Sequence, residues 1–349
     1  MSNIRVGTSG WNYPSGEGTW NGVFYPKPRP KGFDELVFYA EHFDTVEVNS
    51  TFYGQPRAEI TRGWADRTPH GFEFSLKLYQ KFTHPKMFEE RLRRSVPDTR
   101  SRHGASAASN RGGDGVPAAS RKRGAPREVK NDDLVQMLVR PNESDVDEFR
   151  RGIDPLASSG KLGALLAQFP ASFKDSPRSR DYLDGLLRAF GEYRVAVELR
   201  HKSWSDNIGE TLQVLNAFDA AWVQIDEPKF RFSIRQNYLP NVEGFYYMRL
   251  HGRNAKNWWK HDKSEDRYDY LYSSEELKEF SETADAARRL VKKLYLYTNN
   301  HFSAKSVANA VMIKEQLGEP IEGEYPAPFA ARFPDLANTV TPARTSGLF

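Results

Sequence analysis

Two glutamates stand near the ends of apolar segments, where they could serve as a general acid and a general base. Glu47 lies in FDTVEVNSTFY (43–53) and Glu198 in VAVELRHKSW (195–204). Hydrolysis of a glycosidic or N-glycosidic bond uses such a pair of carboxyl groups, and their separation decides the mechanism. His251, on a later segment, adds an imidazole that can carry protons. Together these residues point to acid/base chemistry.

One lysine and two arginines provide positive charge in the same kind of position. Lys77 lies near the end of FEFSLKLY (72–79), where it could form a Schiff base in a dry barrel or a salt bridge with a nearby carboxylate. Arg200 and Arg249 suggest an anionic ligand such as phosphate or carboxylate, because guanidinium groups bind these ions through paired hydrogen bonds. The expected catalytic residues are Glu47, Lys77, Glu198 and His251.

Further polar and aromatic side chains lie at the ends of the same kind of apolar segment, where they would line a ligand pocket. Such pockets combine apolar and aromatic walls with a few convergent polar groups. Aromatic side chains at a barrel rim can also simply pack loops, and charged ones can form a structural ion-pair network. The expected substrate-binding residues are Trp11, Tyr13, Asn49, Tyr53, Gln168, Arg200, Asp226, Arg249, Asn299, Asn300 and His301.

The elements that must position these residues are eight short apolar or alternating segments. They cover residues 4–13, 43–53, 72–79, 162–170, 195–204, 220–226, 244–252 and 293–301. Helical patterns lie between most of them, at 33–42, 55–66, 143–157, 179–190, 205–218, 274–290 and 303–317. Asn142 or Ser144 would begin the third of these helices, and Ser273 would cap the sixth. Strands alternating with helices predict a single-domain α/β fold of the TIM-type (β/α)8 class, whose active site lies at the carboxyl ends of the strands.

Alternation along each strand indicates which side chains share a face. Residues two apart point the same way, so Glu198 and Arg200 share a face, as do Gln224 and Asp226. We expect all the polar faces to point into the upper barrel. The two candidate glutamates would then pair with Lys77 and the arginines, because an isolated buried charge costs several kcal/mol.

Metal binding is conceivable but has no specific motif. Carboxylates and His201, His251 and His301 at strand ends could assemble a zinc, manganese or magnesium site. There is no HxH or HExxH spacing, so no metal ligands are assigned and no cofactor is required. GTSG, in the first segment, is not a phosphate loop, and the chain has no GxSxG serine elbow.

Charge is distributed unevenly along the chain of 349 residues. The formal net charge is +4, but segment 91–130 alone holds 11 Lys and Arg against 3 Asp and Glu. Its part from 96 to 130 is rich in Gly, Ala, Ser, Pro and Arg and predicts a disordered basic insertion after the third strand. We expect one barrel domain over 1–320, interrupted by this insertion, and an extended tail over 321–349.

Composition also indicates in which cellular compartment the protein is expected. The chain has no cysteine, which excludes disulfides and a cysteine nucleophile. No basic-then-apolar leader precedes the first strand, and no apolar run approaches the length of a membrane helix. We therefore expect a cytoplasmic protein without membrane partners.

Several motifs in order resemble those of the YecE-like barrel family, known as domain of unknown function 72. They include GTSGWNY, FDTVEVNSTFY, VAVELRHKSW, YYMRLHGRN and the terminal NNH followed by ANA. The motifs WNGVFYP and FTHP also fit. The resemblance spans 4–312 outside the insertion and implies a (β/α)8-type barrel, but no particular reaction.

Two classes of function remain open from the sequence. The leading hypothesis is a hydrolase- or lyase-type enzyme acting on a small anionic, sugar- or nucleotide-like substrate. The alternative is a non-catalytic barrel that binds a nucleotide or nucleic acid. Nucleic acid could contact the basic insertion or GRNAKNWWKHDK (252–263), where tryptophans could stack on bases beside basic residues.

Overall fold

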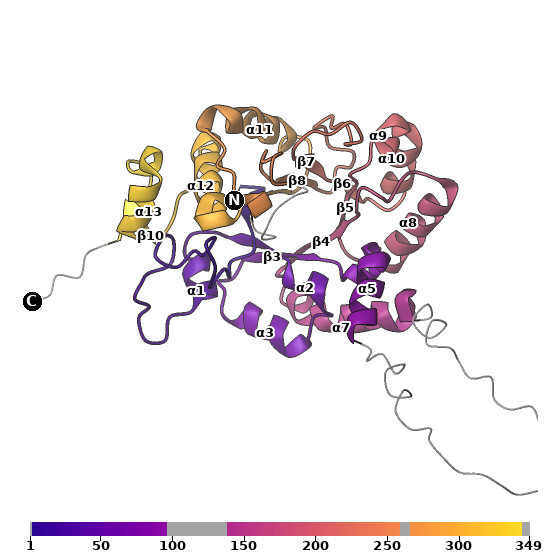
Figure 1. Ribbon diagram of the computed structural model, residues 1–349, viewed down its shortest axis with the longest axis horizontal. Coiled ribbons are helices and arrows are strands. Elements are labelled where there is room, and N and C mark those ends of the chain that lie inside the picture. The colour runs from indigo at the N-terminus through magenta and orange to yellow at the C-terminus, as the bar shows by residue number, and fades with distance from the viewer. Residues whose placement is uncertain (1, 96–137, 259–265, 344–349) are drawn as a thin grey trace, which may run out of the picture.

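The predicted barrel is confirmed by the computed structural model, which describes residues 2–95, 138–258 and 266–343 (Figure 1). Its main strands are β1 (Ile4–Ser9), β2 (Thr45–Val48), β3 (Glu73–Lys77), β4 (Leu162–Gln168), β5 (Val195–Glu198), β6 (Ala221–Trp222), β7 (Gln224–Asp226), β8 (Tyr246–Leu250) and β9 (Leu294–Thr298). The insertion predicted at 96–130 lies outside the described residues.

The strands form one parallel ring in the order β6-β5-β4-β3-β2-β1-β9-β8-β7. The sixth predicted strand is divided at Val223 into β6 and β7. β6 pairs with β5 and β7 pairs with β8, while the Val223 amide donates to the Val197 carbonyl at 3.0 Å. This divided segment therefore closes the barrel.

Helices surround the strands, as Figure 1 shows. They are α1 (Glu35–Ala40), α2 (Ser50–Tyr53), α3 (Ala58–Asp66), α4 (Gln80–Thr83), α5 (Pro85–Ser95), α7 (Glu143–Ser158), α8 (Pro177–Ala189), α9 (Ser203–Asp206), α10 (Ile208–Asn216), α11 (Ser274–Ala287), α12 (Lys305–Leu317) and α13 (Ala327–Arg332). Short 3-10 turns lie at Asp266–Tyr268, Phe302–Ala304 and Pro334–Leu336. Residues 227–243 between β7 and β8 are a loop.

Two predicted helix starts are confirmed in detail. The Asn142 side chain accepts from the Asp145 amide, and the Asp145 side chain accepts in return from the Asn142 amide. Ser273 and Glu276 form the same reciprocal capping box at the start of α11. Each box satisfies amide groups that the first turn of a helix leaves without partners.

The barrel interior and the layer beneath the helices are both buried. Tyr247, Tyr295 and Tyr297 fill the centre of the barrel, where each is 0% exposed. Tyr297 OH donates to Ser75 Oγ at 3.0 Å, so the phenol groups find partners inside. The intervening strand residues, such as Val48, Leu76 and Leu250, pack outward beneath the helices.

The C-terminal segment differs from the expected extended tail. α13 buries Phe329 completely, with its ring 6.1 Å from that of Phe24 and 5.0 Å from that of Tyr325. A short strand β10 (Glu324–Tyr325) pairs in parallel with β11 (Thr341–Pro342). The expectation of an extended tail from 321 was therefore wrong for the described residues. The apolar residues spaced along this proline-rich segment provide the packing.

The described part of the chain contains no helix that is both long enough and apolar enough to cross a lipid bilayer.

Candidate active site

A buried ion pair joins Arg249 on β8 to Glu47 on β2 near the carboxyl ends of the strands. Arg249 Nε donates to Glu47 Oε2 at 2.9 Å, and Nη2 donates to Oε1 at 2.6 Å. Ser9 Oγ and Tyr247 OH each donate to the same carboxylate at 2.7 Å. Four donors thus hold Glu47, which is 0% exposed. This saturation favours a role in positioning Arg249 over a role in proton transfer.

Glu198 on β5 lies on the other side of the same guanidinium. Its Oε2 accepts from Arg249 Nη1, and its Oε1 accepts from Arg200 Nε at 2.7 Å. Burial of Glu198 would raise the pKa of this carboxyl, but Arg249 and Arg200 outweigh burial and hold it well below the usual value. Glu198 is therefore a carboxylate at neutral pH.

Arg200 extends this chain of charges toward the solvent. Its Nη1 lies 3.2 Å from Glu227 Oε2, and its side chain is 17% exposed, whereas that of Arg249 is 1% exposed. Burial raises the pKa of Glu227, against the effect of Arg200. Negative and positive groups thus alternate in the order Glu47, Arg249, Glu198, Arg200 and Glu227. Because Arg200 is the more exposed of the two arginines, it is the one that a ligand could reach.

His251, which directly follows β8, contacts both Arg249 and Arg200. Its Nε2 lies 3.3 Å from Arg249 Nη1 and 3.3 Å from Arg200 Nη2. Asn299 Nδ2 lies 2.8 Å from the other ring nitrogen. Burial and the charge of Arg249 lower the pKa of His251 to about 3, so the ring is neutral at neutral pH. A neutral, fully buried imidazole can orient the arginines but carries no proton to donate as a cation.

Lys77 belongs to this cluster but forms no ion pair with its described carboxylates. Its Nζ forms no hydrogen bond or ion pair with any described residue, and it lies 4.0 Å from the centre of the Phe52 ring. Burial, together with the positive charge of Arg249 and Arg200, lowers the pKa of Lys77 to about 7. Among the residues that the structure describes, no carboxylate forms the salt bridge considered from the sequence, and the amine is partly uncharged near neutrality.

The strand register shows which predicted residues face the interior. Ser75 pairs with Glu47, so Lys77, two residues later, also points inward. Gln168 pairs with Glu198 and shares its inward face. The sequence therefore placed these strands correctly.

Asp226 is a correction to the sequence analysis. Ile225, not Asp226, pairs with the inward-facing Arg249, so Asp226 points out of the barrel. There it accepts from Tyr272 OH at 2.7 Å and from Arg253 Nε at 2.8 Å. Gln224 faces outward as well and accepts from the Tyr238 amide. Helices cover the outside of the barrel, so both faces of each strand are buried. The polarity of Gln224 and Asp226 therefore did not show which face of β7 points into the barrel.

Other predicted binding residues lie around the rim in different settings. The Trp11 ring packs edge-on against Trp64 at 5.5 Å. The His301 ring stacks on Tyr13 at 4.3 Å. Asn300 donates to the Tyr270 carbonyl and to Asn309, both at 2.7 Å, which is a structural role. Tyr53 is 62% exposed, and Asn49 is partly buried at the start of α2.

Two residues of the cluster were missed by sequence reasoning. Glu227 directly follows the strand residue Asp226, and its position after a strand end was a usable signal. His84 lies in the FTHP motif, and its ring meets the Phe52 ring edge-on at 5.0 Å. Burial and the charge of Lys77 lower the pKa of His84 to about 3. Both residues therefore belong to the surroundings of the candidate site.

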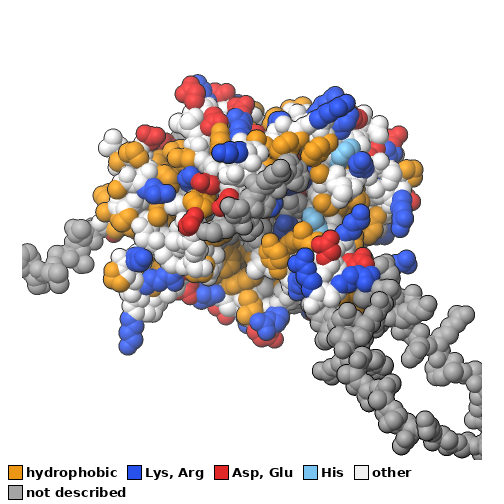
Figure 2. Space-filling model, in the orientation of Figure 1, with side chains coloured by type: hydrophobic (Ala, Val, Ile, Leu, Met, Phe, Trp, Pro, Cys, Tyr) orange, Lys and Arg blue, Asp and Glu red, His pale blue; other side chains and the backbone are white. Residues whose placement is uncertain are grey.

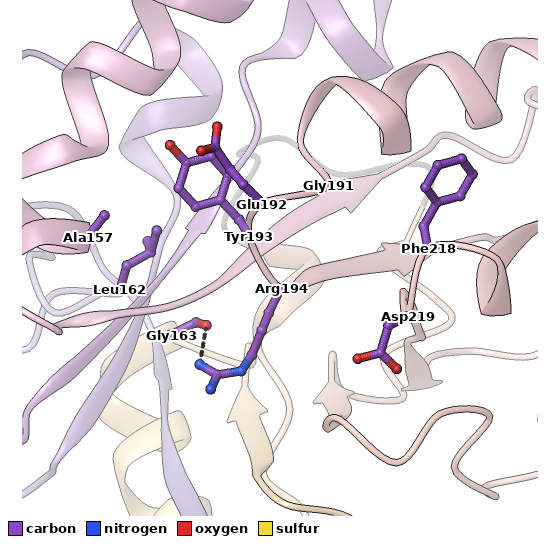
Figure 3. A pocket seen from close by; sticks show the side chains of 9 residues that line it. All are labelled: Ala157, Leu162, Gly163, Gly191, Glu192, Tyr193, Arg194, Phe218 and Asp219. Atoms are coloured by element: carbon purple, nitrogen blue, oxygen red, sulfur yellow. Dashed lines mark hydrogen bonds between the residues drawn. The ribbon is translucent and has the colours of Figure 1, made fainter.

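Cavities occur at both ends of the barrel. One of about 380 Å³ is lined by Trp11, Tyr13, Asn49 and Trp64 beside the ends of β1 and β2. Another, of about 460 Å³, lies where β4 and β5 begin and is lined by Gly163, Arg194 and Asp219 among others (Figure 3). The amino ends of the strands usually contribute stability rather than chemistry in this fold. We therefore place the candidate site at the carboxyl ends.

The face seen in Figure 2 and the described His, Asp and Glu side chains bear on two further possibilities, a nucleic-acid surface and a metal site. Acidic and basic side chains are interspersed on the face in Figure 2, where the described residues form no continuous basic surface. Within the described ranges, no three His, Asp or Glu side chains come together as a metal-binding group. Residues 259–263 of the expected nucleic-acid loop lie outside these ranges.

Comparisons with known proteins agree with this architecture. The UPF0759 protein YunF of Bacillus subtilis is 24% identical over 336 residues, which are 93% of this chain and 98% of that protein. The UPF0759 protein YecE of Escherichia coli K12 is 27% identical over 194 residues, which are 55% of this chain and 50% of that protein.

Solved structures of similar proteins share the fold. A DUF72 family protein from Thermotoga maritima has a TM-score of 0.66 and 29% identity, covering 90% of this chain and 99% of that one. One from Enterococcus faecalis has a TM-score of 0.67 and 22% identity, covering 92% and 98%. The family model described as "Protein of unknown function DUF72" matches residues 5–331. Because this match covers nearly the whole chain, the protein belongs to the DUF72 family.

Proposed function

We propose that this protein is a lyase-type enzyme that acts on a small carbonyl compound through the amine of Lys77. The observation that carries the proposal is the isolation of this amine. Lys77 points into a cluster of buried carboxylates and guanidinium groups, yet its Nζ has no ion-pair or hydrogen-bond partner among the described residues. A lysine kept free in such surroundings is available for reaction.

The chemistry suits a Schiff base. An amine attacks a carbonyl carbon only when it is unprotonated, and a pKa of about 7 leaves Lys77 partly unprotonated at neutral pH. A C–N bond forms, the carbonyl oxygen leaves as water, and a C=N bond to Lys77 remains. The protonated C=N group can then accept the electron pair of an adjacent bond, which gives an enamine. If a C–H bond breaks, its proton passes to water. If a C–C bond breaks, the fragment that carries a hydroxyl group leaves as an aldehyde or ketone and the hydroxyl proton passes to water.

The two glutamates support this role better than a role as an acid/base pair. Glu47 accepts four hydrogen bonds, and Glu198 is held by two arginines. A general acid must be protonated at working pH, whereas the pKa of Glu198 lies well below its usual value. Their contribution is to fix Arg249 and Arg200, whose charges lower the pKa of Lys77 together with burial, although the two carboxylates themselves raise it.

The arrangement also bears on the substrate. Both arginines are paired with carboxylates, but the Arg200 side chain is 17% exposed and that of Arg249 is 1% exposed, so Arg200 is the one that a carboxylate or phosphate could approach. An open-chain sugar is a small carbonyl compound, so the sugar-like class inferred from the sequence remains compatible. A nucleotide- or nucleic-acid-binding barrel would not require a reactive lysine.

Borohydride trapping tests the proposal. The protein is incubated with glyceraldehyde and sodium borohydride at pH 7.5, digested and examined by peptide mass spectrometry. We expect the reduced adduct on Lys77 at several times the level on Lys202, a 45% exposed surface lysine. Lys77→Met should abolish the adduct, while Lys202→Met should leave it unchanged.

A second measurement does not depend on the variant folding. In the native protein, the labelling of Lys77 should rise with a midpoint near pH 7, well below the ordinary pKa of a lysine. Labelling of Lys77 that stays equal to that of Lys202 from pH 6 to pH 9 would overturn the proposal and leave the non-catalytic binding barrel as the better account.

A further inference from the structure

We infer that the cavity beside His84 is a substrate subsite that receives the apolar end of the carbonyl compound. This inference rests on the proposed function and narrows its substrate class to aldehydes or ketones that carry a short alkyl or aryl group. The cavity has a volume of about 340 Å³ and lies between the start of α5 and the loop after β4. That size is within the range of small-molecule sites.

The position of the cavity relative to Lys77 is the first argument. The Phe52 ring contacts both Lys77 and His84. Its centre is 4.0 Å from Lys77 Nζ, and its ring meets the ring of His84 edge-on at 5.0 Å. His84 itself lines the cavity. A ligand with its carbonyl carbon at the amine can therefore extend past Phe52 and His84 into the cavity.

The chemistry of the walls is the second argument. Pro85, Met87, Pro170 and Phe173 present mainly apolar surface. Lys86 also lines the cavity, but it is exposed. His84 contributes no charge, because burial and the neighbouring Lys77 lower its pKa to about 3. These walls favour an alkyl or aryl group over a second charged group.

The third argument is the rigidity of one wall. The Phe173 ring stacks on Phe169 with the ring centres 4.2 Å apart and on Trp204 at 5.3 Å. Trp204 Nε1 donates to the Phe173 carbonyl at 2.8 Å, which fixes the backbone as well. On the other wall, Met87 is 47% exposed and lies where a flexible apolar side chain can adjust to a ligand. A rigid aromatic wall facing an adaptable one suits a ligand-binding pocket.

Trapping with a series of aldehydes measures the subsite. Propanal, butanal and pentanal are compared with sodium borohydride, and the concentration that gives half-maximal labelling of Lys77 is recorded. Each added methylene that enters the cavity should lower this concentration by about threefold to fourfold. Met87→Trp should fill the cavity and remove this dependence on chain length. Ile60→Trp, at a 43% exposed site on α3 outside the cavity lining, should preserve it.

A second readout is independent of the reactivity of Lys77. The chain has 5 methionines, so a sample with 13C-labelled methionine methyl groups gives few signals, and Met87→Leu identifies the one from Met87. Titration with 1-pentanol, which has no carbonyl group, should shift the Met87 signal and leave those of the buried Met248 and Met312 in place.

The two readouts separate the possible failures. Pentanol binding at Met87 without any preferred Lys77 adduct would retain the subsite and overturn the proposed function. A Lys77 adduct that shows no dependence on chain length, together with no shift at Met87, would overturn the subsite and retain the function.

Discussion

Arg249 donates through Nη1 to Glu198 Oε2 inside the barrel, where the two side chains are 1% and 0% exposed. The same guanidinium holds Glu47 through Nε and Nη2. The charges of Arg249, Glu47 and Glu198 are therefore all separated from water, and each is stabilised by its ion pairs within this group. Removing one member leaves a buried ion without its partner, and this dependence can be measured.

Glu198→Gln should destabilise the protein by about 3–5 kcal/mol at neutral pH, because Arg249 and Arg200 lose a shared counter-ion. Chemical denaturation measures the change. Glu192→Gln is the control, since Glu192 is 56% exposed in its pair with Arg150, and about 0–1 kcal/mol is expected there. Comparable small losses in both variants would contradict the network.

The same pair of proteins gives a pH prediction. The pKa of Glu198 is depressed in the folded protein, so its stabilising contribution is present above the ordinary pKa of a glutamate. That contribution is lost as pH falls through the folded-state value. The stability difference between wild type and Glu198→Gln should therefore be largest above about pH 5 and shrink at lower pH. A difference that grows on acidification would exclude this ion-pair account.

Arg249→Lys should cost about 2–4 kcal/mol, because one ammonium group cannot make two parallel contacts to Glu47 and also reach Glu198. Thermal and denaturant unfolding measure the loss. Arg67→Lys is a matched exchange at a 42% exposed site, where Arg67 pairs with Asp34, and a loss below about 1 kcal/mol is expected. If Arg249→Lys were equally mild, the geometry of the guanidinium would be unimportant.

Lys77→Met should raise stability at neutral pH, since it removes an ammonium group that the folded protein disfavours. The pKa of Lys77 is lowered to about 7 on folding. Below that pH the amine is protonated in both the folded and the unfolded protein, so the folded protein is destabilised by the full free-energy cost of burying the ammonium group. The cost disappears as pH approaches the unfolded value near 10.5. The advantage of Lys77→Met should therefore decrease by roughly 2–4 kcal/mol between pH 7 and 10. Parallel stability curves for the two proteins would refute the lowered pKa.

Phe329→Ala tests the packing of the C-terminal segment. Phe329 is 0% exposed, so its removal should cost about 3–5 kcal/mol. Leu290→Ala, at a 60% exposed position, is the control and should change stability by about 0.5 kcal/mol or less. Equal losses in the two variants would mean that the packing of Phe329 adds no more to the free energy of unfolding than an exposed side chain does.

Much of the fold and part of the candidate site could be predicted from strand periodicity. A parallel barrel brings the carboxyl ends of its strands to one rim, so residues as far apart as Glu47, Glu198 and Arg249 had to approach one another. The same argument failed for Asp226. Both faces of a barrel strand are buried, so its polar residue could serve the layer under α11 as well as the interior.

The amino-acid sequence by itself determined the barrel, the order of its strands and the identity of the charged residues at the rim, because these follow from local periodicity and strand polarity. The tertiary structure decided which charges meet. Arg249 forms ion pairs with Glu47 and Glu198, whereas the amine of Lys77 contacts the face of the Phe52 ring. Such pairing depends on side-chain reach, register and burial across strands that are distant in the chain, and a pattern along one strand carries no information about these distances.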